Sequence, residues 1–111
     1  MSSKWQTGLM GEFKAMRFLK KQGMKILAFR YRTRHGEIDL IARDGNETVF
    51  VEVKSRPSGK MGEGIRAVNQ EKRQHLRYAA KCYLSAHPAS SFRFDVIEIS
   101  AAGLRHFKQA F

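Results

Sequence analysis

The sequence predicts one α/β domain in which helices flank a mixed sheet of four to five strands, in the order αβββαβ(β). Its 111 residues suffice for a single domain with one modest core. Apolar residues recur at helical spacing in some segments and alternate with polar residues in others. The expected helices cover residues 7–22 and 65–86, and the expected strands lie at 24–32, in a hairpin over 36–54, at 91–100 and, as an optional fifth, after Gly103.

The segment 36–54 is predicted to be a β-hairpin, because apolar and polar residues alternate on both sides of a short turn. Gly45 and Asn46 tolerate the positive φ values that tight hairpin turns require. One face of the hairpin is expected to belong to the core through Ile38, Leu40, Val49, Val51 and Val53. The other face carries most of the charged residues and is the candidate functional face.

The turn also predicts which residues stand opposite each other. With a loop made of two residues, Asp39 lies opposite Glu52, and Glu37 lies opposite Lys54. Residues directly opposite project from the same face, with Cβ atoms about 5 Å apart. One face therefore carries two facing carboxylates, with an ammonium group farther along the strand.

Facing carboxylates repel each other unless something compensates their charge. Mg²⁺ is commonly held by one or two carboxylates together with waters and phosphate oxygens, so Mg²⁺ or Mn²⁺ is the expected cofactor. The alternative is a solvated polar face whose Glu–Lys pairs are surface ion pairs of little energetic value. The whole arrangement favours the metal site over this alternative.

The composition indicates a soluble globular protein, with 42% hydrophobic and 28% charged residues. No run approaches the ~20 apolar residues of a membrane span, and the N-terminus has no apolar signal core. The single cysteine, Cys82, fits a reducing compartment and makes a zinc site improbable. We therefore expect a cytoplasmic protein without a membrane partner.

The charge balance predicts a polyanionic partner. The formal net charge is +11, from 21 Lys and Arg against 10 Asp and Glu. Neutralising phosphates releases counterions, so such a surface favours nucleic acid. Basic charge can instead serve solubility or bind acidic lipid, but the acidic residues gather in the hairpin. A basic surface with a local acidic cluster is what a metal-dependent phosphodiesterase requires.

The first expected helix runs from Thr7, as its cap, to Gln22, and Gly23 ends it. Its apolar stripe is expected to be Leu9, Phe13, Met16 and Leu19. Glu12 lies inside this stripe, and a buried charge is costly unless it is paired or binds something. Glu12 is therefore either a third carboxylate of the site, a residue at the edge of the stripe that reaches water, or the partner of a core arginine.

Arg30 and Arg32 end the first expected strand and Arg34 follows it, and a glycine-rich loop over 55–64 follows the hairpin. Both segments either contact substrate phosphates or serve as connections. In the second helix, Lys72 falls in a gap of the apolar stripe and is expected to point toward the sheet. Gln74 and Tyr78 lie opposite that stripe and are discounted. The candidate phosphate-binding residues are Arg30, Arg32, Arg34, Arg56, Lys60 and Lys72.

These motifs resemble known protein families. Asp39 followed by Glu52-Val53-Lys54, after a helix that carries Glu12, resembles the PD-(D/E)xK nuclease core. This set is similar to that of archaeal Holliday-junction resolvases. Nearly the whole chain resembles the YraN family of small bacterial proteins, most specifically in the block GEIDLIARD…VFVEVKSR. One departure is that no proline precedes Asp39, but many nucleases of this superfamily also lack it.

The resemblance implies a restriction-endonuclease-like core and a single nuclease-like domain over 1–111. In such a site Asp39 and Glu52 would hold the metal ion, with the carbonyl of Val53 as a further ligand. Glu12 would complete the site directly or through a water. Lys54 would orient the attacking water or stabilise the transition state.

The resemblance also bears on substrate and assembly. It implies phosphodiester hydrolysis on DNA, with branched or junction DNA recognised by shape. Junction cleavage needs two active sites, so a homodimer is expected by analogy. Two other classes remain open: a nucleic-acid-binding module with a relic site, and a nuclease-fold subunit that acts only with a partner.

Overall fold

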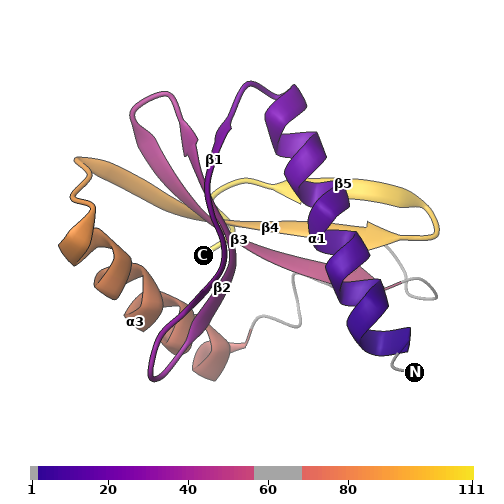
Figure 1. The fold of residues 1–111 in the computed structure, drawn as a ribbon, viewed down its shortest axis with the longest axis horizontal. Helices are drawn as coiled ribbons and strands as arrows, with labels where there is room; N and C mark the ends of the chain where they lie inside the picture. The colour runs from indigo at the N-terminus through magenta and orange to yellow at the C-terminus, as the bar shows by residue number, and fades with distance from the viewer. Residues whose placement is uncertain (1–2, 57–68) are drawn as a thin grey trace.

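A computed structural model describes residues 3–56 and 69–111 of the chain. The elements, in the colours of Figure 1, follow the predicted order with the fifth strand present. They are α1 (Ser3–Lys21), β1 (Lys25–Arg32), β2 (Glu37–Asp44), β3 (Glu47–Arg56), α3 (Gln70–Ala86), β4 (Ser91–Ser100) and β5 (Gly103–Phe107).

The sheet contains five strands in the order β1-β2-β3-β4-β5. All neighbours are antiparallel except β3 and β4, which run parallel, so the sheet is mixed as predicted. Parallel neighbours need a crossover connection, and the segment that contains α3 joins this pair. Helices α1 and α3 flank the twisted sheet (Figure 1). This arrangement confirms the α/β class and agrees with a restriction-endonuclease-like core.

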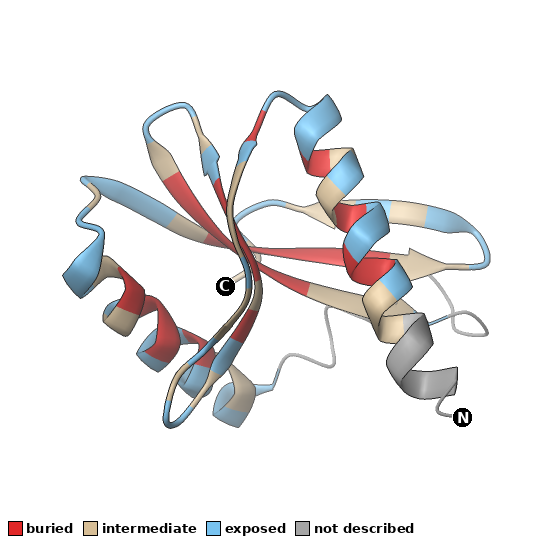
Figure 2. Ribbon diagram, viewed as in Figure 1, coloured by how far each residue is buried: buried red, intermediate tan, exposed pale blue. Residues whose placement is uncertain are grey.

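Each helix covers its own hydrophobic cluster, so apolar residues are buried on both faces of the central strands (Figure 2). The cluster under α1 contains Leu40, Val49 and Val51. The cluster under α3 contains Ile41 and Phe50. The prediction that only one face of the hairpin belongs to the core was therefore too narrow, because the second helix covers the other face as well.

Helix α1 begins earlier than predicted. It starts at Ser3, so Thr7 lies within the helix and does not cap it. Its end agrees with the prediction: Gly23 has φ +90°, a conformation that favours glycine, and the N–H of Met24 donates to the carbonyl of Leu19.

The buried face of α1 is also rotated relative to the expected stripe. Phe13 is 52% exposed, whereas Ala15 and Leu19 are fully buried and Glu12 is 8% exposed. The cause is a close approach of the helix to the sheet at Gly11, where a Cβ atom would collide with the hydroxyl of Ser55. Small residues therefore face the sheet, and the large ring of Phe13 is turned outward.

The hairpin register is confirmed over its inner part. Gly45 has φ +62° at the turn, and the pairs run from Asp44↔Glu47 to Leu40↔Val51. Strand β3 continues to Arg56 because β4 pairs with it along its length, so the expected loop does not begin at residue 55. The remainder of that loop, with Lys60, lies outside the described residues.

Helix α3 begins at Gln70, because Asn69 has extended backbone and its side-chain oxygen accepts the N–H of Lys72 as an N-cap. The expected helical start at 65 is therefore wrong for Asn69, and residues 65–68 lie outside the described part. The predicted stripe is confirmed where it is described, since Leu76, Ala79 and Tyr83 are buried.

The C-terminal strands enclose a buried polar network. The Asp95 carboxylate has no exposed surface and accepts hydrogen bonds from Arg93, from the ring of His106 and from the N–H of Gln109. Phe111 packs on the cluster under α3. Among the helices that the structure describes, none is both long and apolar enough to cross a membrane.

Candidate functional site

Strands β2 and β3 stop pairing at the point where the predicted site begins. Their last paired residues are Leu40 and Val51. Beyond them, Oδ2 of Asp39 accepts the backbone N–H of Val53 at 2.7 Å. A side chain thus satisfies a donor where the ladder ends. Asp39 and Glu52 were predicted to be paired across the ladder, but the ladder ends before them. The two strands diverge there, and this leaves room for both carboxyl groups between the strands.

The carboxyl groups of Asp39 and Glu52 lie within hydrogen-bonding reach of each other. Burial and the neighbouring charge of Glu52 raise the pKa of Asp39 to about 8. Burial also opposes ionisation of Glu52, but hydrogen bonds from Asp39 and Lys72 outweigh it and lower the pKa of Glu52. At neutral pH the protonated Asp39 therefore donates to an ionised Glu52, and the pair holds one proton.

Two lysines neutralise the remaining charge of this pair. Nζ of Lys72 lies 2.9 Å from Oε2 of Glu52, and Nζ of Lys54 lies 3.2 Å from the same oxygen. The Glu52 side chain is only 3% exposed. Burial would lower the pKa of Lys72, but its hydrogen bond to Glu52 raises it, so the ammonium form is favoured. The predicted orientation of Lys72 toward the sheet is confirmed.

Glu12 pairs with an arginine. Nε of Arg30 donates to Oε1 of Glu12 at 2.7 Å, and both side chains are largely buried. Of the three roles that the sequence left open for Glu12, the structure shows the pairing with an arginine in the core. The pair still lies close to the carboxyl pair, because the charge of Glu12 contributes to the raised pKa of Asp39.

The backbone reverses its facing pattern beside this pair. Ile38 belongs to the cluster under α3, whereas Leu40 belongs to the cluster under α1. Residues two apart on a regular strand share a face, so the pleat is interrupted at Asp39. On the neighbouring strand β1, Arg30 has φ +51°, which is unusual for a residue with a side chain. This local irregularity sends Asp39 and Arg30 toward the site and explains why Ile38 departs from its predicted face.

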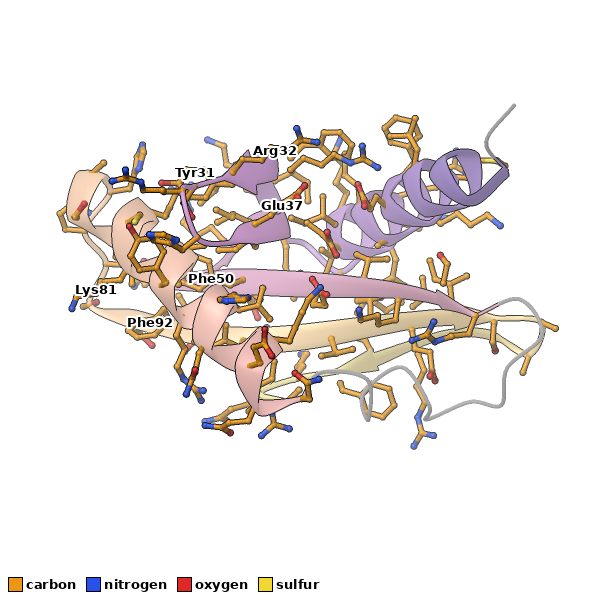
Figure 3. All side chains as sticks on the ribbon, turned by 90° about the horizontal axis from the view of Figure 1, so that it is seen from below. Tyr31, Arg32, Glu37, Phe50, Lys81 and Phe92 are labelled. Atoms are coloured by element: carbon orange, nitrogen blue, oxygen red, sulfur yellow. The ribbon has the colours of Figure 1, made fainter. Side chains whose placement is uncertain are left out.

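The other predicted charged residues lie outside the carboxyl pair. Glu37 is exposed and accepts from Arg32 at 3.4 Å, so it does not pair with Lys54 (Figure 3). Arg34 and Arg56 are exposed, as a phosphate-binding role requires. Lys60 lies outside the described residues. The structure thus brings Asp39, Glu52, Lys54 and Lys72 together and leaves the exposed arginines around them.

The donor set fits a magnesium-like ion in one respect. A buried carboxyl group, that of Glu52, beside the half-buried one of Asp39 is the kind of ligand pair that Mg²⁺ or Mn²⁺ uses when waters and phosphate oxygens complete its shell. Within residues 3–56 and 69–111, no group of three or more acidic, histidine or cysteine side chains is arranged to hold a metal. Asp39 and Glu52 are the two described carboxyl groups that would be available to such an ion at this site.

Two features of the site escaped sequence reasoning. The contact of Lys72 with Glu52 was not predicted, although the place of Lys72 in the gap of an apolar stripe was the available signal; its contact with phosphate stays a prediction. The identity of Arg30 as the partner of Glu12 was not predicted either, and the contact of Arg30 with phosphate stays a prediction. A positive φ at an arginine has no signature in the sequence, so this second pairing could not be predicted.

Comparison with known proteins supports the resemblance seen in the motifs. A model of uncharacterised protein family UPF0102 matches residues 11–99. A UPF0102 protein of Caldicellulosiruptor saccharolyticus is 42% identical over 99 residues, covering 87% of this chain and 84% of the relative. A UPF0102 protein of Klebsiella pneumoniae is 40% identical over 110 residues, covering 96% of this chain and 86% of the relative.

Proposed function

The chain belongs to the UPF0102 family, and from its pair of carboxyl groups, Asp39 and Glu52, we propose that it is a metal-dependent nuclease that hydrolyses phosphodiester bonds in DNA. The observation that carries this proposal is the meeting of the Asp39 and Glu52 carboxyl groups where β2 and β3 diverge, with the ammonium groups of Lys54 and Lys72 at 3.2 and 2.9 Å from Glu52. A pair of acids that cannot both ionise without a counter-ion is prepared to accept a divalent cation. The basic composition supports a nucleic-acid substrate.

In this proposal the residues of the chain have distinct roles. Asp39 and Glu52 would hold Mg²⁺ or Mn²⁺ once the shared proton has left, with the Val53 carbonyl as a candidate further ligand. The ion would supply a water of lowered pKa and a positive charge near the scissile phosphate. Lys54 and Lys72 would turn from Glu52 to hydrogen-bond the phosphate oxygens and stabilise their growing charge. The Glu12–Arg30 pair would position Asp39.

The surrounding cations would bind the backbone. Exposed Arg32, Arg34 and Arg56, together with Lys60 of the glycine-rich loop, would contact phosphates and fix the position of the strand without reading its sequence. A substrate of this kind would be branched or junction DNA, and two copies of the chain would be needed to cut both strands of a junction. Such a protein would act in the cytoplasm, which accords with its single cysteine.

A second candidate is a nucleic-acid-binding module whose site is a relic. Two observations favour it: both lysines already neutralise Glu52, and Glu12 is bound to Arg30 and does not join the carboxyl pair. In that case the cations would bind phosphates, while the carboxyl pair would serve only the fold.

Cleavage assays separate these candidates. Supercoiled plasmid and synthetic junction, flap, duplex and single-stranded DNA are incubated with Mg²⁺ or Mn²⁺ and with wild type, Asp39→Asn or Glu52→Gln. Glu37→Gln is the matched control, because Glu37 is an exposed carboxylate of the same hairpin. The nuclease proposal expects metal-dependent cutting that both site variants abolish and the control retains. Binding without cutting in wild type supports the relic module, and cutting that survives both site variants refutes the proposed site.

A further inference from the structure

Two phenylalanine rings stack on each other at the surface, and one of them, Phe29, pairs across the sheet with Leu40, the neighbour of Asp39 in the chain. Phe13 of α1 is 52% exposed and Phe29 of β1 is 38% exposed. Their centroids lie 5.7 Å apart, with only 14° between the ring planes. We call Phe13 and Phe29 the aromatic platform. Two large rings held parallel in contact with water indicate a binding surface more than a packing defect.

The platform is connected to the candidate site through the ion pair of Glu12 and Arg30. Phe13 follows Glu12 and Phe29 precedes Arg30, and these two charged residues are bonded at 2.7 Å. The guanidinium of Arg30 also lies 5.5 Å from the centre of the Phe29 ring. Charges on both members of the ion pair interact with Asp39. A ligand on the platform would therefore lie next to whatever the carboxyl pair holds.

The charge around the platform favours an anionic occupant. Glu12 is the sole acidic residue of α1, and Arg30 already neutralises it. Lys14 and Arg17 are exposed on the same helix, with Arg17 one turn from Phe13. A nucleic acid strand combines flat rings with a negative backbone, and aromatic side chains beside cations are the usual means of binding single strands.

We propose that the aromatic platform stacks an unpaired nucleobase of the strand that the carboxyl pair holds. The substrate would then carry single-stranded nucleotides next to the phosphodiester that is cut, as a flap or an open junction does. In a continuous duplex every base is already stacked between its neighbours and cannot lie on the rings. The inference rests on the proposed nuclease function for its site, but its test measures binding.

The test uses a fluorescent base. Asp39→Asn protein, which should not cut, is titrated with an oligonucleotide containing 2-aminopurine, once single-stranded and once fully paired. Stacking on an aromatic ring quenches this base. Phe13→Leu and Phe29→Leu keep an apolar side chain but remove the ring face, and Phe13→Trp restores one. Phe92→Leu is the matched control, because Phe92 is 48% exposed and packs against Phe50 and Phe94, away from the platform.

The expected result is quenching on the single strand, with affinity about tenfold weaker in each platform leucine variant and retained in Phe13→Trp and Phe92→Leu. Duplex affinity should stay the same in all of them. Equal affinity in the platform leucine variants, or equal losses on duplex and single strand, would overturn the inference. So would a wild-type dimer that the leucine variants dissociate in sedimentation, since the rings would then be a subunit interface.

The two proposals can fail separately. Metal-dependent cutting by wild type that Phe13→Leu and Phe29→Leu leave unchanged on flap substrates would overturn the platform and leave the nuclease standing. Ring-dependent quenching by a protein that never cuts would support the platform and refute the nuclease.

Discussion

Nζ of Lys72 lies 2.9 Å from Oε2 of Glu52, so helix α3 supplies a cation to a carboxyl pair that belongs to the β2–β3 hairpin. The same oxygen lies 3.2 Å from Nζ of Lys54. The Lys54 position is part of the motif that resembles a nuclease core, whereas Lys72 comes from a different element. The position of the first turn of α3 therefore determines whether Lys72 reaches Glu52.

Replacing Lys72 tests whether this cation serves the reaction. Lys72→Gln is expected to slow metal-dependent cleavage at least tenfold, because one hydrogen-bond donor for the phosphate is lost. The fold should persist, since the substituted side chain lies at the exposed start of α3. Single-turnover cleavage rates measure the effect. Lys81→Gln, on the exposed side of the same helix, is the control; equal rates for both variants would refute the role of Lys72.

The proton shared by Asp39 predicts how stability depends on pH. The pKa of Asp39 is about 8 in the folded protein, against 3.8 for an ordinary aspartate. The folded state therefore binds this proton more tightly than the unfolded state does. The contribution of protonated Asp39 to the free energy of unfolding is complete below pH about 4 and is lost as pH rises through about 8. Metal-free wild type should lose stability relative to Asp39→Asn across this window, by at most about 1.4 kcal/mol per pH unit.

Urea unfolding of the metal-free protein at several pH values from 5 to 9 measures this difference. The side chain at position 39 of the Asp39→Asn variant does not titrate, so the plot of its free energy of unfolding against pH should be flatter in that range. Parallel curves for the two proteins would show that Asp39 ionises normally and that the carboxyl pair holds no shared proton.

Glu12→Gln distinguishes the two roles considered for Glu12. Because Glu12 is bonded to Arg30, the substitution should lower the free energy of unfolding by about 1–3 kcal/mol, the usual effect of weakening a largely buried hydrogen-bonded charge pair. Mn²⁺ affinity, measured by calorimetry, should change little, whereas Glu52→Gln should abolish it. A loss of Mn²⁺ binding in Glu12→Gln as large as in Glu52→Gln would make Glu12 a metal ligand after all.

Much of the fold could be predicted because it rests on local patterns. The family resemblance was confirmed by the comparisons, and the hairpin register followed from a turn in which Gly45 takes the positive φ that the sequence indicated. Strand β4 has the expected bounds, because alternation and flanking turn residues mark both of its ends. These features depend on neighbours in the chain and not on distant packing.

The errors arise where distant contacts decide. Phe13 was expected in the core, but the close approach of α1 to β3 at Gly11 rotates the helix and exposes the ring. Glu37 was expected opposite Lys54, but the strands diverge beyond Leu40 and leave Glu37 with Arg32. Local sequence periodicity predicts neither the distance at which a helix packs on the sheet nor the residue at which two strands stop pairing. The proximity of Asp39 and Glu52 survived this divergence because their side chains span the widened gap.

The network around Asp95 predicts a large effect on stability far from the chemistry. Asp95 is fully buried and accepts from Nε of Arg93 at 3.0 Å and from the ring of His106 at 2.7 Å. Burial opposes its ionisation, but the hydrogen bonds from His106 and Arg93 prevail and lower its pKa. The contribution of ionised Asp95 to the free energy of unfolding is therefore present above the ordinary aspartate pKa. It is lost as pH falls through the lower pKa that Asp95 has in the folded protein. Asp95→Asn should cost about 3–5 kcal/mol, since it removes the fully buried carboxylate that Arg93 and His106 share, although Asp44 and Glu47 still contact Arg93.

Asp44→Asn provides the matched comparison, because Asp44 contacts the same guanidinium at 3.1 Å but is 39% exposed. Its loss should cost at most about 1 kcal/mol, as exposed ion pairs do. Urea unfolding at pH 7 measures both variants, and neither should change cleavage per folded molecule. The two carboxylates bind one arginine, so their difference isolates the effect of burial. Equal destabilisation would mean that Arg93 is held by the network as a whole and that the buried position of Asp95 adds nothing.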